Sequence, residues 1–328
     1  MSIWARRAVS IPLWTALAIL LAATLPIWAP LTLLVDLLTG RRKLPRTRAL
    51  LFFLLYLWCE VAGIVAAGVL WFIRAGGRIG GASSYVDANA ALQRVWSQTL
   101  FDGACRIFGM KLEVQGGENA LPAPFLLFVR HSSTADTVLA AAAITNRNRI
   151  LLKYVLKREL LWDPCLDIVG RRLPNAFIDR TGGAEAQTIA VAGLANGLDQ
   201  RTAVLIYPEG TRFTPRKRDA AIEKLRKSGR PDLADLAAEF QNVLPPRLGG
   251  ALSLIEAAPG VDVVFLEHSG FEGARNFQSF WSGALIDRRL SVRIRRIPAK
   301  EIPEQGRDRW LFEQWGEVDR FVTLQRAA

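Results

Sequence analysis

The chain has 328 residues, of which 51% are hydrophobic and 22% charged, and its formal net charge is +12. This length and apolar content suffice for a large folded core, which excludes a chain that is disordered throughout. The three cysteines, Cys59, Cys105 and Cys165, are far apart and form no CxxC pair. We therefore expect neither a disulfide framework nor a structural zinc site, and no bound metal.

Two long apolar segments lie in the first quarter of the chain. Residues 11–38 contain Asp36 as their only charge, and residues 49–73 contain only Glu60. About 20 apolar residues span a bilayer as a helix, so both segments are long enough. A cleaved signal peptide is a poor fit, because the first segment is too long and a second one follows it. We expect a membrane-embedded pair of helical segments.

The loop between these segments constrains their arrangement. Residues 41–48 carry five cations, which are costly at the centre of a bilayer. The positive-inside rule places this loop in the cytoplasm. Pro12, Pro26 and Pro30 can break the first segment into a re-entrant or in-plane piece. If the first segment breaks in this way, the globular part can face the cytoplasm, on the same side as the loop. The expected location is a membrane, and specifically a bacterial inner membrane.

The expected division is a membrane anchor at residues 1–81 and one globular domain at residues 82–328. Beyond residue 73 the chain still has 35 basic and 28 acidic residues. A solvated basic face accounts for this excess, and so does attraction to an anionic membrane leaflet. Nucleic acid is not an expected partner, because no recognised nucleic-acid-binding module is present.

The globular part has the pattern of an α/β fold. Short apolar runs of strand length alternate with helical stretches, which is typical of a largely parallel sheet covered by helices. The expected strands are residues 112–115, 125–129, 150–155, 203–207, 261–267 and 290–296, and the expected helices are residues 86–108, 134–145, 184–199, 217–228, 232–241, 248–257 and 308–325.

Polar residues follow the apolar run FLLFV at 125–129. After Arg130 the sequence reads His-Ser-Ser-Thr-Ala-Asp, from His131 to Asp136. Open α/β sheets form their sites beyond the carboxyl ends of strands. With the histidine in a loop and the aspartate in the first turn of a helix, the two side chains can approach. An aspartate that accepts from one imidazole nitrogen leaves the other as a base. Alone, HxxxxD is a weak pattern that a structural loop also explains.

Two further clusters follow. The run AVLIY at 203–207 leads into PEGTR at 208–212, and residues 177–180 read Phe-Ile-Asp-Arg before two glycines. Arg180 and Arg212 suit the bidentate binding of a phosphate. Each cluster alone is more often a structural turn or a surface ion pair. Three clusters in this order, at spacings of about 45 and 30 residues, are a much more specific signal.

These motifs resemble the four blocks of the glycerophospholipid acyltransferases, typified by the 1-acylglycerol-3-phosphate (lysophosphatidic acid) acyltransferases. HxxxxD, FIDR, YPEGTR and an apolar strand at 261–267 appear in the family's order, and the resemblance covers about residues 85–325. The two N-terminal apolar segments are similar to a branch that includes lysocardiolipin acyltransferases. The resemblance implies an O-acyltransferase of phospholipid biosynthesis with an α/β fold. It would move a fatty acyl group from acyl-CoA or acyl-carrier protein to a lysophospholipid hydroxyl, with 1-acylglycerol-3-phosphate the expected acceptor.

The resemblance also implies roles for individual residues. His131 is the expected general base and Asp136 its partner. No covalent enzyme intermediate and no cofactor are expected, because the acyl thioester is a co-substrate. The residues expected to bind the acceptor phosphate are Arg180, Glu209, Gly210, Thr211, Arg212 and Lys157.

Two positions depart from the family pattern. Arg130 stands where family members commonly have Asn, and the strand at 261–267 lacks the usual proline. The first departure leaves the headgroup open, so lysophosphatidylglycerol and lysocardiolipin are alternative acceptors. A non-catalytic membrane-binding scaffold is a further alternative, which the intact histidine–aspartate pair and the YPEGTR block disfavour. A hydrolase built on His268 is also disfavoured, because we expect that residue in an ordinary loop after a strand.

Overall fold

The computed structural model describes residues 2–133, 135–179, 183–274 and 276–327. Its helices are α1 (Ile3–Ala23), α2 (Leu25–Leu38), α3 (Pro45–Ile73), α4 (Gly81–Phe108), α5 (Asp136–Ala140), α6 (Asn146–Asn148), α7 (Ala184–Ala192), α8 (Pro215–Lys227), α9 (Pro231–Ala238), α10 (Leu248–Ala257), α11 (Phe277–Trp281) and α12 (Arg307–Ala327). Its strands are β1 (Lys111–Gln115), β2 (Phe125–Val129), β3 (Leu151–Lys157), β4 (Ala176–Ile178), β5 (Thr202–Ile206), β6 (Asp262–Ser269) and β7 (Arg289–Ile297).

The chain packs as two compact units. The expected division at residue 82 between an anchor and a catalytic domain stays a prediction. The first unit is Met1–Lys111, Leu156–Asp179 and Asn276–Arg288, and the second is Leu112–Val155, Arg180–Arg275 and Arg289–Ala328.

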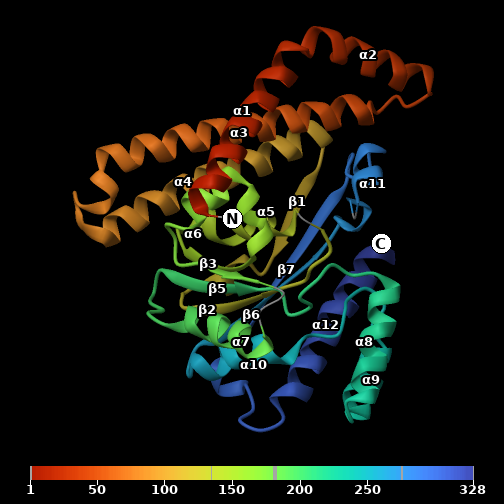
Figure 1. The fold of residues 1–328 in the computed structure, drawn as a ribbon. Helices are drawn as coiled ribbons and strands as arrows, with labels where there is room; N and C mark the ends of the chain where they lie inside the picture. The colour runs from red at the N-terminus through yellow and green to blue at the C-terminus, as the bar shows by residue number, and fades with distance from the viewer. Residues whose placement is uncertain (1, 134, 180–182, 275, 328) are drawn as a thin grey trace. The chain divides into compact units, whose positions relative to one another are not determined.

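The first unit is built on the long helices α1, α2, α3 and α4, of which α3 packs against the other three (Figure 1). The expected break in the first apolar segment occurs at Thr24, between α1 and α2. Pro26 stands in the first turn of α2, where a missing N–H costs no helical hydrogen bond. Pro12 and Pro30 lie inside their helices and do not end them. The first helix also begins earlier than expected, at Ile3.

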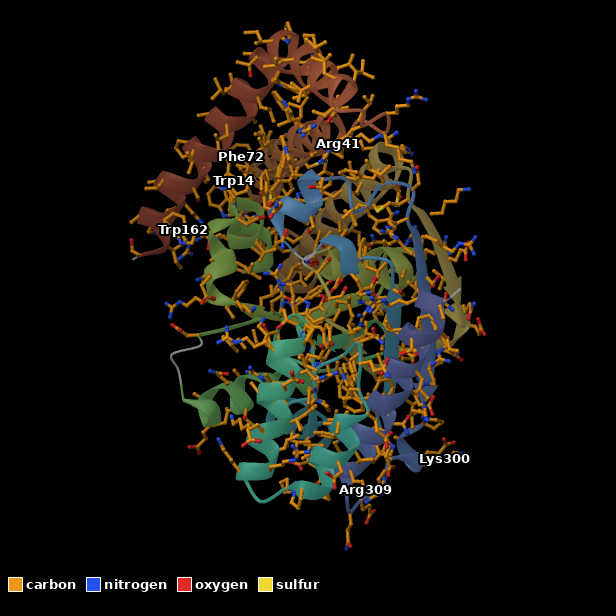
Figure 2. The ribbon with its side chains drawn as sticks, turned by 90° about the vertical axis from the view of Figure 1, so that its right-hand side faces the viewer. Trp14, Arg41, Phe72, Trp162, Lys300 and Arg309 are labelled. Carbon is orange, nitrogen blue, oxygen red and sulfur yellow. The ribbon has the colours of Figure 1, made fainter. Side chains whose placement is uncertain are left out.

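Two helices of this unit, α1 and α3, are long and apolar enough to cross a membrane, judged by length and composition. Large apolar side chains on them are exposed, and Phe72 on α3 is 80% exposed (Figure 2). The cation-rich loop that Arg41 begins joins α2 to α3. Exposed apolar side chains on such helices indicate a surface that contacts lipid or another protein.

The second unit contains a mostly parallel sheet with the strand order β1-β7-β6-β2-β5-β3. The strand β2 pairs in parallel with both β5 and β6, and β3 pairs in parallel with β5. Every residue of β2 and β5 is buried, as expected of continuous apolar runs in a sheet covered on both faces. The expected α/β fold with a largely parallel sheet is confirmed. The strand β7 differs, because it runs antiparallel to β6.

Helices cover this sheet. In Figure 1, α12 lies against β6 and α9, while α7 lies beside α10. The rings of Trp310 and Trp315 on α12 are each 6.3 Å from the ring of Phe265 on β6. Burial of one large apolar side chain stabilises a fold by about 1.5–3 kcal/mol. These aromatic contacts therefore fix α12 firmly to the strand that runs beside β2.

The helix expected at 134–145 is confirmed from Asp136 onward, as α5, a π-helical turn at Ala141–Thr145 and α6 in succession. The helix expected at 184–199 ends earlier than predicted, at Ala192, and a 3-10 turn at Gly193–Ala195 follows it. The strand β4 forms where no strand was expected. The strand β6 runs two residues past its expected end, because β7 pairs with it as far as Ser269. This extension places His268 inside the sheet and not in a loop.

Candidate active site

His131 and Asp136 lie at the carboxyl end of β2. The strand ends at Val129, and Asp136 is the first residue of α5, so the two elements fix both ends of a short loop. Nδ1 of His131 lies 3.1 Å from Oδ2 of Asp136. The expected approach of these two side chains is confirmed by this distance.

The carboxylate of Asp136 is fully buried and is held by the loop that precedes it. Its Oδ2 accepts hydrogen bonds from the backbone N–H of Ser132 at 2.6 Å and of Ser133 at 2.8 Å. Burial alone raises the pKa of Asp136. The imidazoles of His268 and His131 and the N–H of Ser133 outweigh burial and hold that pKa below its ordinary value. An ionised Asp136 keeps the hydrogen of His131 on Nδ1, so Nε2 is the nitrogen that can accept a proton.

The PEGTR turn after β5 lies beside this pair. The ring of Tyr207 packs 4.5 Å from the ring of His131. Gly210 has φ +65° and donates its N–H to the carbonyl of Tyr207 at 2.8 Å. A Cβ at Gly210 would lie 2.9 Å from Cδ of Arg247. Both the positive φ and this close approach require glycine at the turn.

The carboxylate of Glu209 accepts hydrogen bonds from two backbone N–H groups. It is 1% exposed, and its Oε1 accepts from the N–H of His131 at 2.8 Å. Its Oε2 accepts from the N–H of Leu244 at 2.9 Å. Burial raises the pKa of Glu209 to about 8, and the two N–H groups oppose that rise. The side chain thus ties the loop of His131 to the segment at 244, and its expected contact with an acceptor phosphate stays a prediction.

The family model described as Acyltransferase matches residues 111–263, a range that includes the His131–Asp136 pair and the PEGTR turn. The match covers less than half of the chain and shows that this segment is similar to that family. The expected resemblance is therefore confirmed for the part of the chain that contains the site.

The curated proteins to which this chain is similar share one name. The 1-acyl-sn-glycerol-3-phosphate acyltransferase delta of Homo sapiens and that of Pongo abelii are each 26% identical over 175 residues. These matches cover 52% of this chain and 44% of the relatives, so the chain spans less than half of their length. Among solved structures, the 1-acyl-sn-glycerophosphate (LPA) acyltransferase PlsC from Thermotoga maritima matches with a TM-score of 0.47 and 16% identity, over 82% of this chain and 98% of that one.

The remaining predicted residues of the acyltransferase site lie in different places. Thr211 and the exposed Arg212 are the last two residues of the PEGTR turn, and Nζ of Lys217 donates to Oγ1 of Thr211 at 3.1 Å. Lys157 is the last residue of β3 and belongs to the first unit. Arg180 lies outside the described residues. Within the described part of the chain, no cluster of His, Cys, Asp or Glu is suited to hold a metal ion.

Sequence reasoning missed the roles of two buried residues beside the candidate site. Arg130 is 1% exposed, and its guanidinium donates to the carbonyls of His268 at 2.8 Å and Asn242 at 3.0 Å. It also forms an ion pair with Glu272. The arginine that departs from the family pattern therefore points into the domain. Nε2 of the fully buried His268 lies 3.6 Å from Oδ1 of Asp136.

Proposed function

We propose that this chain is a membrane-bound O-acyltransferase that acylates the free hydroxyl of a lysophospholipid. The donor is acyl-CoA or acyl-carrier protein, the acceptor is 1-acylglycerol-3-phosphate, and the product is phosphatidic acid. The observation that carries the proposal is the buried Asp136 carboxylate, 3.1 Å from His131, in a segment similar to the acyltransferase family. The names of the curated relatives support the choice of acceptor.

The proposed chemistry starts from Nε2 of His131. An alcohol is a poor nucleophile near neutral pH, so Nε2 removes its proton as the oxygen attacks the thioester carbonyl carbon. The tetrahedral intermediate then breaks its C–S bond, and the departing thiolate takes the proton from the imidazolium. Asp136 stabilises the imidazolium between these steps. A positioned base of this kind contributes about 10²-fold to 10⁴-fold to the rate.

The proposed acceptor site is cationic. Arg212 is the last residue of the turn that packs beside the base, so an anion bound there is close to the reaction. Clamping the phosphate positions the hydroxyl and lowers the entropic part of the barrier. The residues proposed to bind the phosphate are Arg212, Arg180, Lys157, Gly210, Thr211 and Glu209.

We propose that helices α1 to α3 attach the chain to a bacterial inner membrane, with the acyltransferase domain on the cytoplasmic side. The exposed apolar side chains of α1 and α3 support attachment. The five cations at 41–48 support a cytoplasmic loop, because such loops are rich in Lys and Arg. This location gives the domain access to both an acyl thioester and a lysophospholipid.

The test of this function is thiol release from acyl-CoA by the purified protein in detergent. We expect release only when 1-acylglycerol-3-phosphate is added, with phosphatidic acid identified by mass spectrometry. Lysophosphatidylglycerol and lysocardiolipin serve as competing acceptors, and activity with one of them would change the acceptor. If the folded protein releases no thiol with either acyl-CoA or acyl-carrier protein as donor, the chain is not this enzyme, and the non-catalytic membrane-binding scaffold becomes the favoured function.

Replacing Arg212 tests the phosphate site. We expect Arg212→Ala to raise the apparent KM for the lysophospholipid by about tenfold or more, since a charge-assisted hydrogen bond contributes about 1.5–3 kcal/mol. The KM for the acyl thioester should change much less. Arg226→Ala is the matched control, because it removes the same charge from an exposed position in the last turn of α8. Equal changes in both KM values would contradict an acceptor role for Arg212.

A further inference from the structure

The two histidines of this chain converge on one aspartate. His268 lies near the end of β6, which pairs in parallel with β2 so that Leu266 is opposite Val129. Continued by one residue, this register puts Glu267 opposite Arg130, the residue that follows β2, and His268 one position beyond. His131 lies 3.1 Å from one oxygen of Asp136, and His268 lies 3.6 Å from the other.

Arg130 and His268 hold each other by two hydrogen bonds. Nε2 of His268 lies 2.9 Å from the carbonyl oxygen of Arg130, which can only accept. Nε2 therefore carries the hydrogen, and Nδ1 does not. In return, Nη1 of Arg130 donates to the carbonyl of His268 at 2.8 Å. Together these bonds fix the peptide from which His131 projects.

Asp136 is the second group that His268 affects. The separation of 3.6 Å is too long for a good hydrogen bond, but it leaves the Nε2–H dipole close to the carboxylate. Burial lowers the pKa of His268, so the ring is neutral near pH 7 and acts through this dipole. The other charged or titratable groups around the two side chains are His131, Arg130, Glu272, Glu209 and Tyr207.

We propose that His268 is a positioning residue of the acyl-transfer reaction, which acts by holding the Arg130 carbonyl and by keeping Asp136 ionised opposite His131. This inference rests on the proposed function. It also explains the arginine at position 130, where the family commonly has Asn. The guanidinium of Arg130 donates to the carbonyl of His268, and His268 donates to the carbonyl of Arg130. Among the described residues Nδ1 of His268 has no hydrogen-bond partner, so Nε2 is the atom through which the ring acts.

The test compares His268→Leu with His268→Gln. Leucine removes the donor, whereas glutamine can place an N–H near the position of Nε2. We expect His268→Leu to lower kcat by about tenfold or more, part of the 10²-fold to 10⁴-fold that a positioned base supplies. The KM values for both substrates should stay within about threefold. His268→Gln should recover most of kcat.

The titration of Asp136 separates this role from a loss of packing. Without the N–H dipole the pKa of Asp136 rises, so the titration of its carboxyl carbon, followed by ¹³C NMR, should move to higher pH in His268→Leu and not in His268→Gln. If His268→Leu keeps the kcat and the Asp136 titration of the wild type, the inference is wrong, and the proposed function is unaffected. If His268→Leu does not fold, a loss of kcat in folded His268→Gln as large as about tenfold would overturn it as well. An inactive wild-type protein would overturn the proposed function and this inference together.

Discussion

Replacing His131 with alanine should abolish acyl transfer while leaving the protein folded. The expected fall in kcat is about 10²-fold to 10⁴-fold, because this is what a positioned general base supplies. The fold should persist because the bond from residue 131 to Glu209 is made by the backbone N–H, which alanine retains. The measurement is acceptor-dependent thiol release, with the thermal midpoint of unfolding determined beside it.

The control for His131→Ala is Arg226→Ala, a single truncation at an exposed position of the same unit. It should leave kcat within about threefold of the wild type, because surface substitutions have small effects. Retention of near wild-type turnover by His131→Ala would show that another group takes the proton. A large fall in the thermal midpoint would instead mean that the ring supports the fold through its contact with Tyr207.

The sheet was predictable because the sequences of its central strands are continuous apolar runs. FLLFV at 125–129 and the run at 203–206 are buried in every residue, and a strand buried on both faces needs this composition. The approach of His131 to Asp136 was predictable for a local reason, since only a short loop separates them. The antiparallel direction of β7 was not predictable, because composition does not encode the direction in which two strands pair.

The rest of the site depends on residues far apart in the sequence. Arg130 and His268 are separated by 138 positions, and only the parallel register of β2 and β6 brings them together. Composition gave no sign that an arginine beside the expected base would be buried. The local signal for a buried His268 was the polar pair Glu267 and His268 at the end of an apolar strand. This pair is equally consistent with the start of a loop.

The start of α1 illustrates the same limit in the first unit. Composition places Arg6 and Arg7 outside the apolar segment, yet the helix includes both of them. Arg6 donates to Asp167 at 2.5 Å, and Arg7 donates to the same carboxylate at 2.9 Å. Burial of a guanidinium requires such a partner. The partner is about 160 positions away, so the burial of Arg6 could not be read from the residues around it.

Replacing Glu209 with alanine should have the largest effect on stability. Its carboxylate accepts from the N–H groups of His131 and Leu244, and each donor left without a partner costs about 1–3 kcal/mol. We expect a fall of at least about 5 °C in the thermal midpoint and a loss of transfer. Glu223→Ala is the control, because that carboxylate pairs with Lys227 at an exposed position. An unchanged midpoint with a raised KM for the acceptor would mean that Glu209 binds substrate, as the family resemblance implies.

The pH dependence of stability provides a second test of Glu209. Because burial raises its pKa from 4.5 to about 8, the folded protein binds this proton more tightly than the unfolded chain does. The stabilisation is complete below the unfolded pKa and is lost as the pH rises through the folded pKa. Glu209→Gln keeps one acceptor oxygen and cannot ionise. Its deficit in free energy of unfolding relative to the wild type should therefore shrink between about pH 5 and about pH 8.5. A constant deficit would mean that Glu209 is ionised throughout this range, held so by its two N–H donors.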